Sequence, residues 1–325
     1  MKFLIAGLGS IGRRHLRNLI ALGEKDIILY RTGKSTLPEE ELEGFPTEYS
    51  LEDALGHDPD AVIVSNPTAL HLEVAIPAAQ KGCHLLIEKP VSHSMERIDE
   101  LEKAVRANDC RVLVGFQFRF HPAIRALKHA IDDGAIGKPV YARAHWGEYL
   151  PNWHPWEDHR ESYAAREDLG GGVALTLCHP FDYLRFLFGE ARAISGWTAQ
   201  RSMLKLPVDD IAEATMEFEG GCIASVHLNY VQRPAVHRVE VIGSNGTLNW
   251  SKSEKEVTLD AADGDQSKYY VTDRNFERND VFLAEMQHFI RVAANEERPL
   301  CTLHDGVEAL ELVLALKPLP GLNSL

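Results

Sequence analysis

The stretch that decides the fold reads Phe3-Leu-Ile-Ala-Gly-Leu-Gly-Ser-Ile-Gly12. Four apolar residues run into the first of three glycines, which are spaced as G-x-G-x-x-G, and a segment with helical periodicity follows. Alone, the motif also fits an ordinary glycine-rich turn, but between a strand and a helix it predicts a dinucleotide-binding turn. The first glycine allows a tight turn, the second lets backbone N–H groups approach a pyrophosphate, and the third allows close helix–strand packing. The residues expected to cradle the phosphates are Gly7, Gly9, Ser10, Ile11 and Gly12.

The second predicted strand ends in Tyr30-Arg-Thr-Gly-Lys-Ser35. A site that selects NAD places a carboxylate at this strand end, where it accepts a hydrogen bond from the ribose 2′-OH. Here Arg31 and Thr32 come first, with Lys34 and Ser35 beyond them. Cations and hydroxyls suit a 2′-phosphate, which Arg can bind through two N–H groups. We therefore expect NADP as the cofactor, with NAD as the alternative; a solvated basic turn is the simpler interpretation.

Composition limits the class of protein. The 325 residues are enough for two domains. A formal net charge of −14 argues against binding to nucleic acid or an anionic membrane, and no apolar run is long enough to span a bilayer. Met1-Lys2 leads directly into the first strand, so no signal peptide is expected. The five cysteines are scattered without a C-x-x-C pair, which is typical of a reduced, cytoplasmic protein.

The first part of the chain alternates short apolar strands with helices, and the strands are expected over 3–6, 27–30, 61–64, 84–87 and 111–114. This alternation predicts a Rossmann domain, in which helices cover both faces of a parallel sheet. Ligands of such sheets bind at the carboxyl ends of the strands. We expect this domain to span residues 1–119.

Period-two strands dominate the remainder, which is expected to form a second domain over residues 120–325. In Ala212–Phe218 every second residue is apolar, and the pattern returns in 224–230. These strands predict an α+β domain with a large, open, mostly antiparallel sheet. Few helices remain to cover its apolar face, and an uncovered apolar face indicates a partner subunit.

Two segments could carry chemistry. Lys89, in Glu88-Lys89-Pro90 at the end of a parallel strand, could exchange a proton with a substrate hydroxyl while Glu88 holds its ammonium group. A cis bond before Pro90 is plausible, and a solvated turn is the alternative interpretation. After Gly170-Gly-Gly172, a helix is expected to present Thr176, His179 and Asp182 three residues apart. His179 could then donate or accept a proton with its tautomer fixed by Asp182, although such pairs are often structural.

A third segment, residues 146–163, is rich in aromatic residues, which suit the face of a sugar ring. The substrate-contacting residues expected here and on the helix are Tyr149, Trp153, Tyr163, Thr176 and Asp182. The histidines and acids of this loop, His154, Glu157, Asp158 and His159, match no familiar ligand spacing, so no metal is expected.

Together these landmarks resemble the glucose–fructose oxidoreductase, inositol dehydrogenase and MocA family over essentially the whole chain. The matching motifs are the glycine fingerprint, Asn66-Pro-Thr68 with His71, Glu88-Lys-Pro90, Gly115-Phe-Gln-Phe-Arg119, Gly134-Ala-Ile-Gly137, the triple glycine before His179, Val208-Asp-Asp210, and Val241–Leu248.

The resemblance implies that Lys89 contacts both the nicotinamide and the reacting hydroxyl, and that His179 is the substrate-side proton donor or acceptor. It implies that the cofactor is lined by Ser65, Asn66, Pro67, His71, Glu88 and Gln117. It also implies that the open sheet pairs subunits into homodimers or homotetramers. The chain departs from the family where an aspartate often precedes the histidine by about one helical turn, because Thr176 stands nearest to that place and a hydroxyl cannot act as a carboxylate base.

The sequence thus predicts a dehydrogenase or reductase that transfers a hydride between NADP and a sugar carbon bearing a hydroxyl or ketone. Lys89 and His179 would handle the proton. The alternative is a cofactor-binding regulatory or scaffold protein of the same fold.

Overall fold

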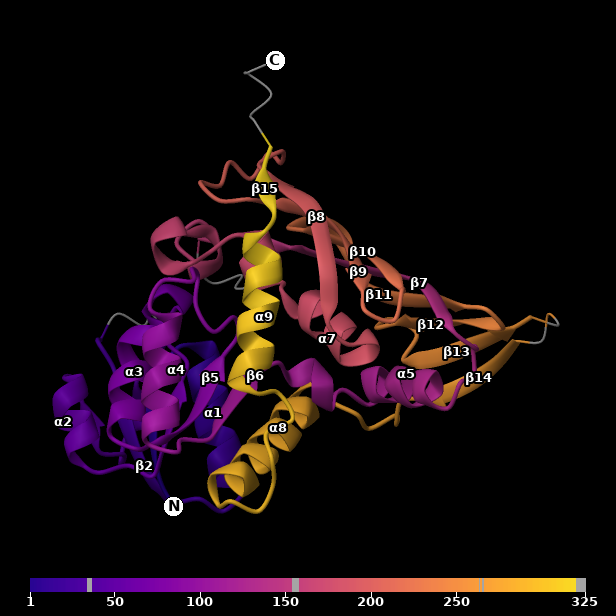
Figure 1. The fold of residues 1–325 in the computed structure, drawn as a ribbon. Helices are drawn as coiled ribbons and strands as arrows, with labels where there is room; N and C mark the ends of the chain where they lie inside the picture. Colours follow the sequence, from indigo (N-terminus) through magenta and orange to yellow (C-terminus); the bar gives the residue numbers. More distant parts are fainter. Residues whose placement is uncertain (34–36, 154–157, 263, 265, 320–325) are drawn as a thin grey trace. The chain divides into compact units, whose positions relative to one another are not determined.

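The fold is that of a computed structural model, which describes residues 1–33, 37–153, 158–262, 264 and 266–319. These residues group into two compact units (Figure 1). The first unit combines Met1–Gln117 with Arg278–Leu310. The second combines Phe118–Glu277 with the residues from Glu311 onward.

The first unit contains a parallel sheet, in which the described residues form six strands in the order β3-β2-β1-β4-β5-β6. These strands are β1 (Lys2–Ala6), β2 (Asp26–Tyr30), β3 (Thr47–Glu48), β4 (Ala61–Val64), β5 (His84–Glu88) and β6 (Val112–Gly115). The predicted parallel sheet is confirmed, although β3 and the helix after it were not foreseen. The order in which the chain adds strands reverses between β1 and β4, and in such sheets ligands bind outside the carboxyl ends of the strands at this point.

Helices cover both faces of this sheet. Figure 1 shows α3 beside α4, while α1 packs against α8. The helices of this unit are α1 (Ser10–Ala21), α2 (Leu51–Gly56), α3 (His71–Gln80), α4 (Ile98–Ala107), α8 (Arg278–Ala293) and most of α9 (Leu303–Leu314). Helix α1 buries Leu16 and Leu19 completely, as its apolar spacing predicts. The short 3₁₀ turns here are η1 (Glu40–Leu42), η2 (Thr68–Leu70) and η3 (Gln117–Phe120), the last of which spans the boundary with the second unit.

The structure corrects the predicted second domain of 120–325 near the C-terminus. Helix α8 contacts α1, β5 and β6, and the backbone N–H of Val114 donates to the carbonyl oxygen of Cys301 at 2.9 Å. Gly306 packs so tightly that a Cβ there would lie 2.6 Å from Val91. Residues 278–310 therefore belong to the first unit. The boundary was missed because this packing joins segments far apart in the sequence.

The second unit contains a large mixed sheet, in which the described residues form nine strands in the order β14-β13-β12-β11-β7-β10-β9-β8-β15. Neighbouring strands are antiparallel except for the pairs β7–β10 and β8–β15. The strands are β7 (Pro139–Tyr149), β8 (Ala191–Ala199), β9 (Ile211–Phe218), β10 (Ile223–Asn229), β11 (Val231–Gly243), β12 (Gly246–Ser251), β13 (Glu256–Ala261), β14 (Gln266–Val271) and β15 (Lys317–Pro318). The predicted α+β architecture is confirmed.

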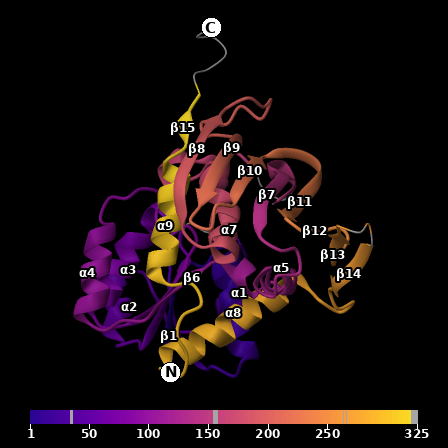
Figure 2. The same cartoon turned by 45° about the vertical axis from the view of Figure 1, so that its right-hand side comes forward.

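The two faces of this sheet differ in a way that corrects the sequence interpretation. The apolar residues of β9, such as Met216 and Phe218, are fully buried. Their side is covered by helices, because α6 contacts β9 and β10 and α7 contacts β10, while α5 lies along β13 and β14 (Figure 2). The opposite face is mixed: His227 lies between Glu213 and His145 in one row, and Tyr141 lies between Ile223 and Ile242 in another. The expected uncovered apolar face is therefore wrong, because the helices between residues 122 and 188 suffice to cover it.

The helices of the second unit are α5 (Pro122–Asp132), α6 (Val173–Thr176) and α7 (His179–Phe188). Its 3₁₀ turns are η4 (Leu150–Asn152), η5 (Tyr163–Ala165) and η6 (Glu167–Leu169). Among the described residues, no helix combines the length and the hydrophobicity needed to cross a membrane.

Candidate functional site

The glycine turn has the geometry that its spacing predicts. Gly7 takes a φ of +93°, and its N–H donates to the carbonyl oxygen of Tyr30 at 3.0 Å. A Cβ on Gly7 would lie 2.5 Å from the backbone nitrogen of Asn66, and one on Gly12 would lie 1.9 Å from the carbonyl oxygen of Gly7. A Cβ on Gly9 would meet nothing within 4 Å. Two glycines thus permit close packing, while the third faces open space.

The N-terminus of α1 is open beside Gly9. Gly9 and Ser10 are exposed, Ile11 is half-buried, and no side chain caps the helix or places a carboxylate in its first turn. Backbone N–H groups at such a helix end attract anions, and the helix dipole adds to the attraction. An uncapped helix end beside an open glycine therefore fits the pyrophosphate of a dinucleotide.

Arg31 follows β2 and is 7 % exposed. Its Nη2 lies 2.5 Å from Oε1 of Glu39, a carboxylate that the sequence interpretation did not include. Thr32 is exposed, and Lys34 and Ser35 lie outside the described residues. The strand end thus carries a cation as predicted, and this cation already has an anionic partner.

The segment after β4 packs against the glycine turn. The hydroxyl of Ser65 lies 2.9 Å from the carbonyl oxygen of Gly7 and 3.1 Å from that of Ala6. Asn66 donates from Nδ2 to the carbonyl oxygen of Leu70 at 2.8 Å, while its buried Oδ1 has no hydrogen-bond partner among the described residues. Pro67 precedes η2. An amide oxygen without a partner at this edge is consistent with a ligand contact.

His71 lies between two turns and is buried. Its Nε2 is 2.9 Å from the carbonyl oxygen of Asn66, and its Nδ1 is 2.9 Å from that of Pro90. Burial lowers the pKa of His71 below its usual value, although the charge of Glu88 opposes this. The ring therefore lies between the turn after β4 and the turn after β5, and in its neutral form it donates to one of the two carbonyl oxygens.

Glu88 and Lys89 stand at the carboxyl end of β5. Burial alone would raise the pKa of Glu88, but the hydrogen bond and charge of His15, with the charge of Lys89, lower it overall. His15 Nε2 lies 2.7 Å from Oε1 of Glu88, and the other oxygen, Oε2, accepts the backbone N–H of Lys89 at 3.3 Å. The Lys89–Pro90 peptide bond is cis, as the sequence suggested. Glu88 is thus an ionised carboxylate held against the base of the lysine.

These residues share one edge of the parallel sheet, because the carboxyl ends of parallel strands lie at the same side. Gln117, which is 8 % exposed, begins η3 just after β6 at this edge. The structure therefore collects in the first unit the residues predicted to contact the cofactor. Their ligand contacts stay predictions.

In the second unit, His179 is the first residue of α7 and is 2 % exposed. The single helix expected through Thr176, His179 and Asp182 is wrong: α6 ends at Thr176 and α7 starts at His179. Pro180 explains the break, because it has no N–H to donate to the carbonyl oxygen of Thr176. Proline is well tolerated in the first turn of the new helix.

Aromatic rings enclose His179. Its ring stacks on Trp146 with a centroid distance of 5.3 Å, and Phe118 meets it edge-on at 4.9 Å. Trp146 also stacks on His237 at 4.3 Å, with their planes 7° apart. Burial lowers the pKa of His237 well below its usual value, and nearby positive charges lower it further. His179 is therefore packed within a cluster of aromatic rings.

Asp182 is held by a buried arginine. Its carboxylate accepts hydrogen bonds from the guanidinium of Arg119, with Nη2 2.7 Å from Oδ1, and both side chains are buried. The substrate contact of Asp182 and its role toward His179 stay predictions beside this ion pair. Arg119 was visible in the sequence only as part of a motif, and no local signal paired it with Asp182.

Three of the predicted substrate residues lie around Tyr230. The ring of Trp153 meets that of Tyr230 edge-on at 5.7 Å. Burial raises the pKa of Tyr230 well above its usual value, with Tyr163 adding to this and Thr176 opposing it. Tyr149 instead lies under the guanidinium of Arg233, 4.1 Å from its ring centroid. The sequence interpretation treated Tyr230 only as a buried strand residue, so it missed this centre.

Asp209 is a second carboxylate near the triple glycine. Its Oδ2 accepts the N–H of Ala174 at 2.9 Å, and a Cβ on Gly172 would lie 2.4 Å from its Oδ1. Burial, together with the neighbouring Asp210, raises the pKa of Asp209 to about 6, although backbone N–H groups oppose this. The Val208-Asp-Asp210 motif contained the signal, but its role was not assigned.

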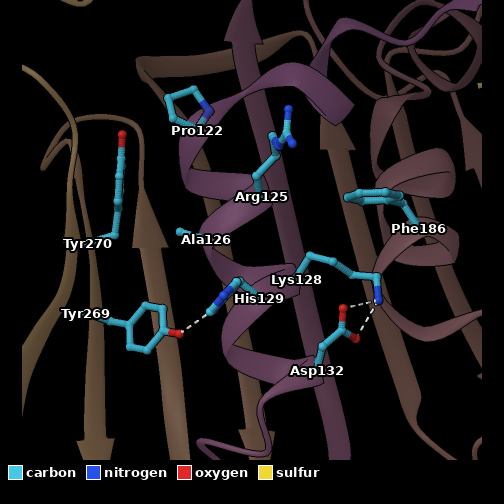
Figure 3. Close-up of a pocket in the computed structure, with 9 residues that line it drawn as sticks. All are labelled: Pro122, Arg125, Ala126, Lys128, His129, Asp132, Phe186, Tyr269 and Tyr270. Atoms are coloured by element: carbon cyan, nitrogen blue, oxygen red, sulfur yellow. Dashed lines mark hydrogen bonds and ion pairs between the residues drawn. The ribbon is translucent and has the colours of Figure 1, made fainter. Parts of the chain in front are cut away.

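A pocket of about 490 Å³ lies elsewhere in the second unit (Figure 3). In Figure 3, His129 of α5 reaches Tyr269 of β14, and Lys128 pairs with Asp132 along the helix. Its lining residues are Pro122, Arg125, Ala126, Lys128, His129, Asp132, Phe186, Tyr269 and Tyr270. None of the predicted site residues lines it. Among the described residues, no three or more His, Cys, Asp or Glu side chains are grouped to hold a metal.

The parallel sheet, its reversal point and the open glycine turn define a Rossmann-type nucleotide-binding protein with a large mixed-sheet second unit. Residues 1–116 match the family model described as "Oxidoreductase family, NAD-binding Rossmann fold". Residues 124–249 match the "GFO/IDH/MocA C-terminal domain". The chain belongs to this GFO/IDH/MocA oxidoreductase family, and the predicted resemblance is confirmed.

Named relatives extend over nearly the whole chain. The myo-inositol 2-dehydrogenase of Thermotoga maritima is 30 % identical, with 98 % of this chain and 95 % of the relative covered. The 1,5-anhydro-D-fructose reductase of Ensifer adhaerens is 32 % identical, over 87 % of this chain and 81 % of the relative. The scyllo-inositol 2-dehydrogenase (NAD(+)) of Bacillus subtilis is 29 % identical, with 96 % of this chain and 91 % of the relative covered.

Solved structures show the same fold. A levoglucosan dehydrogenase in complex with NADH and levoglucosan has a TM-score of 0.85 and 19 % identity, covering 97 % of this chain and 96 % of the other. The myo-inositol 2-dehydrogenase from Lactobacillus plantarum has a TM-score of 0.80 and 24 % identity, covering 97 % of this chain and 95 % of the other.

Proposed function

We propose that this oxidoreductase transfers a hydride between a nicotinamide dinucleotide and a sugar or sugar-derivative carbon that bears a hydroxyl or a ketone. The observation that carries the proposal is the position of Lys89. It follows β5 at the ligand-binding edge of the parallel sheet, and its backbone N–H is held by Glu88, which His15 fixes in turn. A lysine so placed is suited to act on a substrate bound beside the nicotinamide.

The residues of the first unit would hold the cofactor. The open face of Gly9 and the uncapped start of α1 would take the pyrophosphate. The side chains expected to line the rest of the cofactor are Ser65, Asn66, Pro67, His71, Glu88 and Gln117. The structure narrows the role of His71, since both ring nitrogens already face carbonyl oxygens. His71 is therefore proposed to position the lining rather than to touch the cofactor.

When bound, the nicotinamide ring supplies or accepts the hydride. Lys89 would hold or accept the proton of the reacting hydroxyl, and its positive charge would stabilise negative charge on that oxygen. His179 would be the second proton donor or acceptor, with its ring fixed by Trp146 and Phe118. The Arg119–Asp182 pair would only support the helix that carries His179.

A sugar-like substrate is supported by the aromatic side chains around Tyr230. Trp153, Tyr163 and Thr176 could offer ring faces and hydroxyl groups to a polyhydroxylated ring. The relatives named for inositols, anhydrofructose and levoglucosan are consistent with this substrate class.

NADP is the proposed cofactor and NAD the alternative. The support is Arg31, a buried cation at the end of β2 where a carboxylate would favour NAD. Homodimers or homotetramers formed through the second sheet stay a prediction; on its open face Tyr141 lies between Ile223 and Ile242, which are 44 % and 38 % exposed. The cytoplasmic location also stays a prediction; all five cysteines are buried and none forms a disulfide.

The test is a screen of sugars, sugar derivatives and cyclitols with NADPH and NADH, followed at the nicotinamide absorbance band. With the substrate found, Lys89→Ala should reduce kcat by about 10²- to 10⁴-fold while cofactor binding changes by less than about two-fold. Lys103→Ala is the matched control, because Lys103 makes only an exposed pair with Asp99. An unchanged rate in Lys89→Ala would refute the mechanism, whereas dinucleotide binding without turnover of any compound in the screen would favour the regulatory or scaffold alternative.

A further inference from the structure

Glu39, the ion-pair partner of Arg31, indicates a determinant of cofactor choice that lies beyond the end of β2. We propose that Glu39 competes with the 2′-phosphate of NADP for Arg31 and thereby weakens NADP binding relative to NAD binding. The inference rests on the proposed dinucleotide site. It adds an acidic residue, eight positions after Arg31 in the sequence, that tunes selectivity against the phosphate.

Arg31 is a fixed cation. Its backbone N–H donates to the carbonyl oxygen of Glu48 at 3.1 Å, which pins it beside β3. The preceding residue, Tyr30, accepts the N–H of Gly7 at 3.0 Å, so Arg31 stands next to the glycine turn. Its side chain is 7 % exposed. The backbone of Arg31 is thus anchored beside the glycine turn, and its buried guanidinium lies within reach of Glu39.

Glu39 is the exposed member of the pair. Its side chain is 69 % exposed, while its Oε1 lies 2.5 Å from Nη2 of Arg31. The buried charge of Arg31 needs a partner, but the exposed carboxylate of Glu39 can be replaced by a stronger anion that takes over the pairing. A phosphate monoester carries nearly two negative charges near neutral pH and can accept two N–H groups of one guanidinium. The 2′-phosphate therefore fits Arg31 better, but Glu39 must leave first.

The segment that presents Glu39 is anchored separately. Arg13 is 2 % exposed, and its guanidinium donates to the carbonyl oxygens of Leu8, Leu37 and Pro38. Glu41 pairs with Arg17 and lies 3.5 Å from Nη1 of Arg13. Residues on both sides of Glu39 are thus held to α1. Removing the charge of Glu39 should leave this segment in place.

The consequence differs between the two dinucleotides. NADP must displace Glu39 and then places its phosphate near the released carboxylate, so both effects oppose binding. NAD carries a hydroxyl at this position and has no need for the Arg31 site. Glu39 therefore lowers the affinity for NADP selectively.

The experiment measures Kd for NADPH and NADH by calorimetry on the full chain without substrate. Glu39→Gln should tighten NADPH binding by about two- to five-fold and change NADH binding by less than about two-fold. Glu40→Gln is the matched control, because Glu40 is the exposed next residue with the same charge and no ion pair to Arg31. In an Arg31→Gln background, Glu39→Gln should no longer affect NADPH, because the contested cation is gone.

Several outcomes would overturn the inference. Equal tightening in Glu39→Gln and Glu40→Gln would show a general charge effect. Weaker NADH binding in Glu39→Gln would show that Glu39 accepts the ribose hydroxyl instead. Tighter wild-type binding of NADH than of NADPH would refute only the proposed cofactor preference, since the Glu39–Arg31 coupling is measured on NADPH alone. Thermal melting of each variant checks that the fold is intact.

Discussion

Arg119 holds Asp182 through two guanidinium nitrogens, with Nη2 2.7 Å and Nε 3.0 Å from Oδ1, although 63 residues separate them. Asp182 is fully buried and Arg119 is 4 % exposed. Breaking such a pair leaves a charge without compensation in the interior. The pair joins η3 to α7, and it therefore supports the helix that begins with His179.

The first prediction concerns this pair. Asp182→Ala should lower the free energy of unfolding by about 3–5 kcal/mol, because the Arg119 charge stays buried without its carboxylate. Urea unfolding measures the change. Asp168→Ala removes an exposed pair with Arg166 and should cost less than about 1 kcal/mol. A loss below that of the control would contradict a structural role for Asp182.

The second prediction separates packing from binding in the glycine turn. Gly12→Ala should destabilise the first unit by about 2–4 kcal/mol, because its Cβ would collide with the carbonyl oxygen of Gly7. Gly9→Ala should fold nearly as well as the wild type, because its Cβ meets nothing, yet it should bind the dinucleotide more than about ten-fold more weakly. Thermal melting and calorimetric titration measure the two effects. Undiminished binding by Gly9→Ala would show that the pyrophosphate lies elsewhere.

The third prediction follows from Asp209, whose pKa is raised from 3.8 to about 6 by burial. Between those pH values the folded chain binds more protons at this site than the unfolded chain, so the contribution to stability falls as pH rises. Asp209→Asn keeps an oxygen for the N–H of Ala174 but cannot ionise. The variant should gain on the order of 1–2 kcal/mol relative to wild type between pH 4 and pH 8. Urea unfolding at both pH values measures the effect. A difference in the free energy of unfolding between variant and wild type that stays the same at pH 4 and pH 8 would contradict the prediction.

The fourth prediction has the opposite sign. Burial, with the charge of Lys252, lowers the pKa of His121 from 6.5 to about 4. The unfolded chain therefore binds the proton first on acidification, and stability is lost as pH falls from 6.5 to 4. His121→Asn keeps an acceptor for the N–H of Ala123 while removing the titration. The substitution should lower the free energy of unfolding at every pH, because packing contacts of the ring are lost. It should also reduce the decrease in that free energy between pH 7 and pH 4.5 by about 2–3 kcal/mol.

Chemical or thermal unfolding across this pH range checks the fourth prediction. His129→Asn is the control, because His129 is exposed on the same helix. An acid sensitivity equal to that of wild type would show that His121 is already protonated in the folded chain.

Local patterns predicted much of the first unit. The strand ends, the glycine turn and the cis bond at Pro90 follow from short stretches whose own residues impose the geometry. Only glycine fits at Gly7 and Gly12, so the glycine motif by itself predicts the close packing of the turn. The large mixed sheet was also predictable, because period-two patterning is a property of consecutive residues.

The errors lay where distant residues decide. The helix break at Pro180 was readable in principle, because a proline cannot donate to the preceding turn. The ion-pair partners of three site residues could not be predicted, because they meet only in the folded chain. These pairs are Asp182 with Arg119, Arg31 with Glu39, and Glu88 with His15. The covering of the apolar sheet face by helices belongs to the same class.

By itself, the sequence determined the two sheets, the dinucleotide turn and the position of Lys89 at a strand end. Only the tertiary structure decided which charges are already paired, that α8 belongs to the first unit and that His179 rests on Trp146. The reason is physical: backbone geometry is encoded by neighbours in the chain, whereas burial and ion pairing depend on contacts that form only when remote segments pack.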